Sequence, residues 1–364
     1  MLFFELLQIA LGNRERLSVT PSEAEWTELF SFAQEQTLVG IAFTGIELLP
    51  VEQRPPKILL MQWYSLTNMI KERNAEQDQK SLAVANRFLG DGFKSVILKG
   101  QGMAQLYAKG EYRVPGDIDI WIEGDRKTIM NLVSDYSPKN APVYHNVSIC
   151  PIGGTEIEVH FTPSWMNCYF TNRTLQNFFR QYSKKIFCNE EHLVISEDGS
   201  CCYKQLPVPP LEFNRVFILV HIYRHLFGEG IGLRQLMDYY HVLCQGFTEE
   251  ERSETLNILK SLKMLRFAGA VMYVLQTVFG MKDAFLLLPP DEKEGRFLLN
   301  EIMQAGNFGH YDKRIKRVAN ESALHVFLRR TIRNLRFIRS YPSEVLWTPL
   351  FKIWHFTWRK YHGY

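Results

Sequence analysis

Two acidic residues, Asp117 and Asp119, lie one residue apart in the apolar segment GDIDIWI (116–122) of this 364-residue chain. In a strand, residues two apart point to one face, so the two carboxylates would lie side by side with isoleucines on the opposite face. Neighbouring carboxylates repel each other and resist loss of water, and a divalent cation such as Mg²⁺ offsets both costs. Without metal, removal of either carboxylate is expected to leave stability unchanged or to raise it. An exposed strand with alternating polar residues would show the same spacing.

A second segment could hold phosphate. SVILKG (95–100) is an apolar strand pattern that ends at Gly100, and Gly102 follows before a short helical stretch. Backbone N–H groups in a turn of this kind can bind phosphate oxygens. Lys99 adds a positive charge next to the turn.

A third segment, TEIEVHF (155–161), supplies more acidic groups. Its alternation places Glu156, Glu158 and His160 on one face of a strand. A third carboxylate is therefore available to join the aspartate pair. The strand parity does not distinguish Glu158 from Glu156.

The elements that must position these residues form three regions. Period-two segments at 95–100, 117–122, 143–150 and 155–161 predict strands, with helices at 102–108 and 126–136 between them. Helical patterns flank them on both sides. We therefore predict an α+β protein in which a small mixed sheet (93–170) lies between an N-terminal helical region (1–92) and a C-terminal helical domain (171–364).

Particular signals set the expected helix boundaries. TPSE (20–23) has the pattern of a capping box with Pro21 at the first helical position. After Pro55 and Pro56, one long helix is expected to end at Gly90 or Gly92. Further helices are expected in four segments of the C-terminal region, at 211–227, 232–244, 253–280 and 321–341.

The order of these segments resembles a known superfamily. A glycine turn after a strand, G-D-h-D-h on a second strand and an acidic residue on a third are similar to nucleotidyltransferases of the DNA polymerase beta type. LKGQGMAQLY, RVPGDIDIWI and EIEVHF, followed by HIYRH and GLRQLMDYY, resemble more closely an uncharacterised bacterial nucleotidyltransferase family. Two departures are Gln101, where Gly or Ser is usual, and a longer spacer from Gln101 to Asp117.

The resemblance implies a polymerase beta-like core and a chemistry. An enzyme of this kind uses Mg²⁺, as one or two ions, to transfer a nucleoside monophosphate from a nucleoside triphosphate, here expected to be ATP, to an acceptor hydroxyl. Metal-binding and catalytic roles fall on Asp117, Asp119 and Glu158. The acceptor would be a small molecule, a peptide or a protein.

Other residues are assigned to ligands by the same resemblance. The nucleotide is expected at Lys99, Gly100, Gln101, Arg113 and Gly116, and substrate contacts at His160, His221, His225 and Arg234. Two alternatives stay open: an inactive nucleotide-binding or regulatory module with this fold, and a metal phosphohydrolase that uses the histidines of HIYRH. Arg234 and Asp238, four residues apart, could instead form a simple ion pair.

The cysteine spacing, the length of the apolar segments and the distribution of charge exclude some classes of protein. Six cysteines without a C-x-x-C motif indicate reduced thiols rather than a zinc knuckle or disulfide framework. No segment has the apolar length of a spanning helix, and we expect a cytoplasmic protein. Net charge is +3, but residues 313–360 carry twelve Lys/Arg against two Glu, a local +10 that leaves −7 elsewhere. We expect this basic, tryptophan-rich tail to cover the core; nucleic acid is not an expected partner, and membrane-surface contact is a less favoured alternative.

Overall fold

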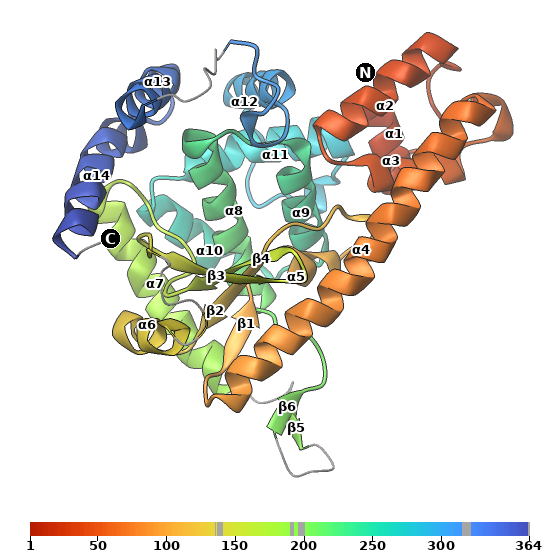
Figure 1. The fold of residues 1–364 in the computed structure, drawn as a ribbon. Helices are drawn as coiled ribbons and strands as arrows, with labels where there is room; N and C mark the ends of the chain where they lie inside the picture. The colour runs from red at the N-terminus through yellow and green to blue at the C-terminus, as the bar shows by residue number, and fades with distance from the viewer. Residues whose placement is uncertain (135, 137–140, 190–192, 196–200, 315–321, 363–364) are drawn as a thin grey trace.

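The protein, described here from a computed structural model, is a mixed α+β structure with a four-stranded sheet among helices (Figure 1). The described residues are 1–134, 136, 141–189, 193–195, 201–314 and 322–362. The main strands are β1 (Ser95–Ile97), β2 (Ile118–Ile122), β3 (Asn146–Ile152) and β4 (Thr155–His160). Their order is β1-β2-β4-β3, with β2 and β4 parallel and the other pairs antiparallel. The predicted fold class, a small mixed sheet with helical flanks, is confirmed.

The two faces of β2 have different surroundings. Ile118, Ile120 and Ile122 fill a core with residues of two helices, α4 (Lys57–Gly90) and α6 (Arg126–Ser134). The opposite face carries Asp119 and Trp121, and the Trp121 ring stacks on Phe213 with centroids 5.8 Å apart. One face of β2 is therefore apolar, whereas the other brings a carboxylate toward the C-terminal helices.

The N-terminal region consists of helices α1 (Leu2–Ala10), α2 (Glu23–Glu35) and α3 (Val39–Leu48), followed by the 34-residue α4. The end of α4 at Gly90 confirms the predicted boundary. The predicted capping box at Thr20 was wrong by two residues. Two Ser/Thr-x-x-Glu patterns overlap there, and the chain uses the second: the Ser22 hydroxyl accepts from the Glu25 N–H, so Pro21 precedes the helix.

The sheet region departs from expectation in its details. The helix after β1, α5 (Gln101–Ala104), is shorter than predicted and is followed by a 3-10 turn, η2 (Gly110–Tyr112). Strand β2 begins at Ile118, so Asp117 lies just outside it. A small hairpin of β5 (Leu193–Ile195) and β6 (Cys201–Tyr203), which no pattern predicted, pairs away from the main sheet.

Most of the remaining described residues lie in helices. Their bounds are α7 (Tyr169–Cys188), α8 (Leu211–Gly228), α9 (Leu233–Cys244), α10 (Glu249–Ser261), α11 (Leu265–Phe279), α12 (Glu292–Ala305), α13 (Ala323–Leu335) and α14 (Pro342–Tyr361). The segment expected to be helical at 253–280 is interrupted by Lys263, whose φ is 59°. None of the helices in the described residues is long and apolar enough to cross a membrane. The division at residues 92 and 170 stays a prediction.

Candidate functional site

The register of two parallel strands brings the candidate ligands together. Asp119 of β2 lies directly beside Glu158 of β4. His160, two residues further along β4, places Nε2 2.9 Å from Asp119 Oδ1 and 3.7 Å from Glu158 Oε2. One ligand atom from each of the three lies within 4.8 Å of the others, a spacing at which they could hold one metal ion.

Two cationic side chains surround this carboxylate pair. The Lys99 ammonium lies 3.0 Å from Asp119 Oδ2. Burial opposes the charged form of Lys99, but Asp119, Asp117 and Glu158 outweigh it and raise the Lys99 pKa above its usual value. For His160, burial is likewise outweighed by hydrogen bonds to Asp119 and Glu158, which raise its pKa to about 9. At neutral pH both groups are therefore positively charged.

This pairing changes the expectation drawn from charge repulsion. Asp119 is only 1% exposed, and both of its oxygens face cations. Its removal would leave Lys99 and His160 buried without their main partner, so a neutral or stabilising effect is no longer expected at this position. Asp117 is exposed, and for it the original expectation stands.

Asp117 lies at the junction of two cavities. A small cavity of about 40 Å³ is lined by Lys99, Gly100, Asp117, His221 and Arg234, among others. A wider pocket of about 410 Å³ on the other side includes Asp117 and Glu156. The two aspartates differ in burial: Asp119 is inside the buried cluster, whereas Asp117 is exposed and lines both cavities.

Arg113 lines the small cavity, and its contact with the nucleotide stays a prediction. Its Nε donates to Asp238 Oδ1 at 2.7 Å and its Nη2 to Oδ2 at 2.8 Å, a bidentate pair from which water is excluded. The Tyr107 hydroxyl donates to the same Oδ1 at 2.6 Å. These contacts occupy the guanidinium, so Arg113 holds the loop before Asp117 in place rather than offering a free cation.

The simple pair of Arg234 with Asp238 is also not formed, because Asp238 is taken by Arg113. Arg234 Nη1 instead donates to the Val114 carbonyl at 3.1 Å. Burial, together with the positive charge of Arg113, lowers the Arg234 pKa to about 10. The local charges thus leave the Arg234 cation under-compensated beside the small cavity.

The glycine turn is present, but its side chains do not all face the site. Gly100 has a φ of 57°, a conformation that favours glycine. The N–H groups of Gly102 and Met103 donate to the carbonyls of Lys99 and Gly100 within the turn. Gln101 is buried, and its Nε2 donates to Asn74 and Asp78 of α4. The Gln101 side chain therefore anchors the turn to α4, and its contact with nucleotide stays a prediction.

The remaining predicted residues have separate positions. Gly116 accepts, through its carbonyl, a hydrogen bond of 2.8 Å from Gln77 of α4. The rings of His221 and His225 are in contact, with centroids 4.4 Å apart, and His225 Nδ1 lies 3.3 Å from a carboxylate oxygen of Glu229. Only His221 of this pair lines the small cavity. Among the described residues, the metal-compatible cluster contains Glu158 rather than Glu156, and neither of these histidines.

Several positioning residues were not predicted. Asn146 at the start of β3 donates from Nδ2 to Glu158 Oε2. Asn74 and Gln77 of α4 donate to the carbonyls of Arg113 and Gly116 and so hold the loop that leads to Asp117. A signal for the α4 residues exists in the sequence, because Asn74, Gln77 and Ser81 recur at helical spacing and all three are buried. We find no comparable signal for Asn146.

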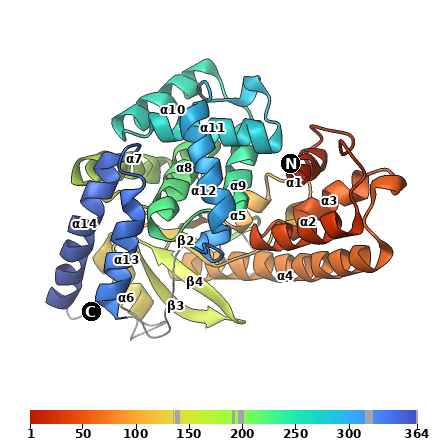
Figure 2. The same ribbon diagram turned by 90° about the horizontal axis from the view of Figure 1, so that it is seen from above.

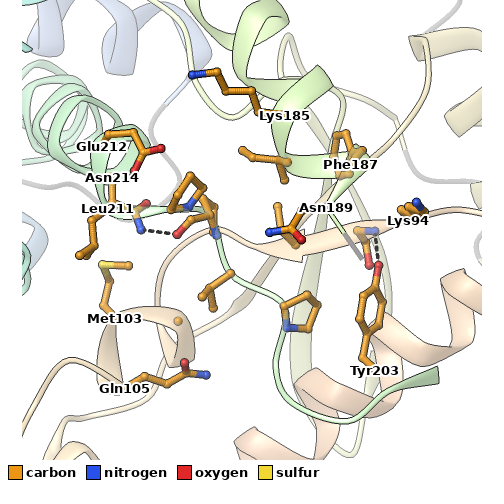
Figure 3. A pocket seen from close by; sticks show the side chains of 18 of the residues that line it. Lys94, Met103, Gln105, Lys185, Phe187, Asn189, Tyr203, Leu211, Glu212 and Asn214 are labelled. Atoms are coloured by element: carbon orange, nitrogen blue, oxygen red, sulfur yellow. Dashed lines mark hydrogen bonds between the residues drawn. The ribbon is translucent and has the colours of Figure 1, made fainter. Parts of the chain in front are cut away.

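A further pocket of about 440 Å³ lies along β1 and α5, and none of the predicted site residues lines it (Figure 3). Its wall is mostly apolar, from residues such as Met103, Phe187 and Leu211. The polar contacts drawn there are internal: Asn214 Nδ2 donates to the Pro209 carbonyl, and the Ser95 N–H donates to the Tyr203 hydroxyl.

Fold and site together combine a small mixed sheet, paired carboxylates in register and cations around them. The chain belongs to the family described as uncharacterised nucleotidyltransferase, which matches residues 22–280. This confirms the nucleotidyltransferase family inferred from the sequence motifs.

A crystal structure titled as an antigenic nucleotidyltransferase-like protein from Paracoccidioides brasiliensis is distantly similar. It shares 12% identity with this chain, covers 59% of this chain and 98% of its own, and has a TM-score of 0.29. No curated protein matches the chain.

Proposed function

We propose that the protein is a Mg²⁺-dependent nucleotidyltransferase of the polymerase beta type, which transfers a nucleoside monophosphate from a nucleoside triphosphate, expected to be ATP, to an acceptor hydroxyl. The observation that supports this most is the parallel register of β2 and β4, which sets Asp119 beside Glu158. Asp117, which directly precedes β2, lines both adjoining cavities.

The donor set fits a divalent cation. Asp119 and Glu158 offer carboxylate oxygens, and we propose Asp117 as a third oxygen ligand. Bound Mg²⁺ would neutralise phosphate charge and lower the pKa of the acceptor hydroxyl. Without it, Lys99 and His160 already balance the buried charge of Asp119, which explains how this carboxylate can be buried at all.

The chain's own cations would bind the triphosphate. Lys99 and Arg234 line the small cavity, together with the N-terminal side of the glycine turn. Arg234 Nε has no hydrogen-bond partner in the described part of the chain. A bound anion would give Arg234 a negative counter-charge, as Asp238 does for Arg113. The wider pocket beside Asp117 is where we place the acceptor.

Thermal unfolding of the wild type and of Asp117→Asn, Asp119→Asn and Glu123→Gln tests this function. Without ligand, Asp119→Asn should lose about 3–5 kcal/mol, because two buried cations lose their partner. Asp117→Asn should be neutral or slightly stabilised. Glu123, an exposed carboxylate just after β2, is the control.

With saturating Mg²⁺–ATP or Mg²⁺–GTP, the wild type and Glu123→Gln should gain about 2.7 kcal/mol at a hundredfold excess over Kd. Both aspartate variants should gain much less. An equal gain in Asp117→Asn would remove Asp117 from the site, and an equal gain in both variants would contradict the proposal. If the protein binds nucleotide, release of pyrophosphate in the presence of an acceptor would indicate an enzyme. Binding without pyrophosphate release would indicate an inactive nucleotide-binding module.

The phosphohydrolase alternative needs a metal on the HIYRH histidines. Burial lowers the pKa of His221 well below its usual value, and the nearby Lys99 and His225 act in the same direction. Such a positive environment opposes cation binding. Metal analysis of protein purified without chelator should therefore show no stoichiometric zinc, and one equivalent of zinc that disappears in His221→Ala would favour the hydrolase.

A further inference from the structure

Helix α13 has an unusual orientation of its apolar face. Leu324, Leu328, Ile332 and Leu335 recur at helical spacing and are 65%, 46%, 66% and 49% exposed. A surface helix normally turns such a stripe toward the core and its charges toward water. The inward contacts of α13 are instead polar: Asn334 Nδ2 donates to the Phe227 carbonyl, and Arg333 Nη1 to the Leu226 carbonyl.

Helix α14 also exposes apolar side chains, although its inner side packs Phe351 against Tyr144 and Trp165. Its exposed side chains include Leu346, Leu350, Ile353, Trp354, Phe356 and Tyr361. Trp354 is 46% exposed, although one side of its ring contacts Tyr144 with centroids 5.9 Å apart, so the tail's tryptophans cover the core only in part. Both views show α13 and α14 together at the edge of the molecule opposite the N-terminal helices (Figures 1 and 2).

The charged side chains of α13 and α14 are mostly basic. Arg330, Arg339, Lys352, Arg359 and Lys360 belong to α13, α14 and the link between them. Burial, with the nearby positive charge of Arg330, lowers the Lys352 pKa to about 8. Within residues 322–362, the acidic residue is Glu344, which is 1% exposed and lies 3.0 Å from Arg224. No exposed carboxylate of this segment balances the cations.

We infer that the exposed face of α13 and α14 docks on the surface of an anionic phospholipid bilayer. The leucine, isoleucine and aromatic side chains would enter the boundary between headgroups and acyl chains, with lysine and arginine at the lipid phosphates. A second copy of the chain would bring two positive faces together, which opposes self-association through this surface. Aliphatic side chains offer nucleic acid neither hydrogen bonds nor stacking.

Co-sedimentation of the full chain with vesicles tests this inference independently of any nucleotidyltransferase activity. Vesicles of phosphatidylcholine with phosphatidylglycerol should bind the protein, and phosphatidylcholine alone should bind it far less. The double variant Ile332→Glu/Leu350→Glu should weaken binding by more than about tenfold, because two apolar contacts are lost. Each of Arg330→Gln and Lys360→Gln should weaken it by about fivefold, and added salt should do the same.

The control is Ile58→Glu/Met61→Glu, which changes two equally exposed apolar residues of α4 and should leave vesicle binding unchanged. Melting temperatures close to that of the wild type would show that all variants are folded. Absence of vesicle binding, equal binding to neutral vesicles, or unchanged binding of Ile332→Glu/Leu350→Glu would overturn the inference. Light scattering could instead show a dimer of the wild type that does not bind vesicles. If Ile332→Glu/Leu350→Glu were then a monomer, the exposed face would be assigned to contact with a second copy of the chain.

Discussion

At the scale of single residues, the Arg113–Asp238 pair determines the shape of the site as much as the carboxylates do. Arg113 belongs to the loop before β2, and Asp238 to α9, 125 residues away. Their bidentate contact joins the loop that carries Asp117 to the C-terminal helices. Because Arg113 neutralises Asp238, Arg234 remains available for a ligand.

We predict that Asp238→Asn lowers the free energy of unfolding by about 3–5 kcal/mol, since it leaves the buried Arg113 guanidinium without a counter-charge. The paired variant Arg113→Met/Asp238→Leu should lose less than the sum of the single changes. Urea unfolding measures both. Arg296→Ala, which breaks an exposed pair with Glu292, is the control and should have little effect. A loss in Asp238→Asn no larger than in this control would show that the pair is not structural.

At the scale of elements, α4 and α14 act as supports for other parts of the chain. The buried amides of α4 hold the glycine turn and the loop before β2. The first turns of α14 bury Glu344, which accepts a hydrogen bond of 2.7 Å from the Asn167 N–H and pairs with Arg224. The later turns of α14 contain no fully buried residue among those described. The first turns of α14 therefore contribute more buried contacts than the later turns.

Two truncations distinguish these parts. Deletion of residues 341–364 should lower the free energy of unfolding by at least about 3 kcal/mol, because Arg224 loses its partner and apolar contacts of Tyr341 and Val345 are lost. Deletion of residues 352–364 should cost much less. Chemical unfolding followed by circular dichroism compares them. Equal losses would mean that the outer turns of α14 are also structural.

At the scale of the whole molecule, the larger of two hydrophobic cores formed by the described residues extends across the predicted regions. It includes Phe3 and Leu6 of α1, Trp121 of the sheet and Phe337 after α13. Polar contacts follow the same path, since Asn13 Nδ2 donates to the Phe279 carbonyl at 2.7 Å. The N-terminal helices therefore cover apolar surface of the C-terminal helices.

This shared core predicts that the regions do not unfold independently. Calorimetry of the full chain should show one main transition, and the fragment 93–364 should lack a cooperative transition because the surface beneath α1 is exposed. Two separated transitions, with a stable fragment, would instead support the domain boundary at residue 92.

Local pattern was sufficient for much of the fold. The periodicity of apolar residues identified the four strands and the long α4, and the spacing in TEIEVHF put Glu158 and His160 on one strand face. The family followed from the order of the motifs. The N-terminal boundary of α2 was predicted two residues too early, because Thr20 and Ser22 each begin a Ser/Thr-x-x-Glu pattern. The cluster of Asp119, Glu158 and His160 was predictable only in part, since His160 was assigned to substrate.

By itself, the sequence determined which residues share a strand face or a helix face, because that depends only on the repeat of each element. The tertiary structure decided which faces meet. The 2.9 Å contact of His160 with Asp119 spans 41 residues and depends on the parallel register of β2 and β4. The pairing of Arg113 with Asp238 also depends on tertiary structure, because the two residues are 125 positions apart in sequence. A buried charge needs a counter-charge, and the packing of distant elements determines which one is near it. Likewise, the apolar stripe of α13 could be recognised in the sequence, but only its packing shows that the stripe faces outward.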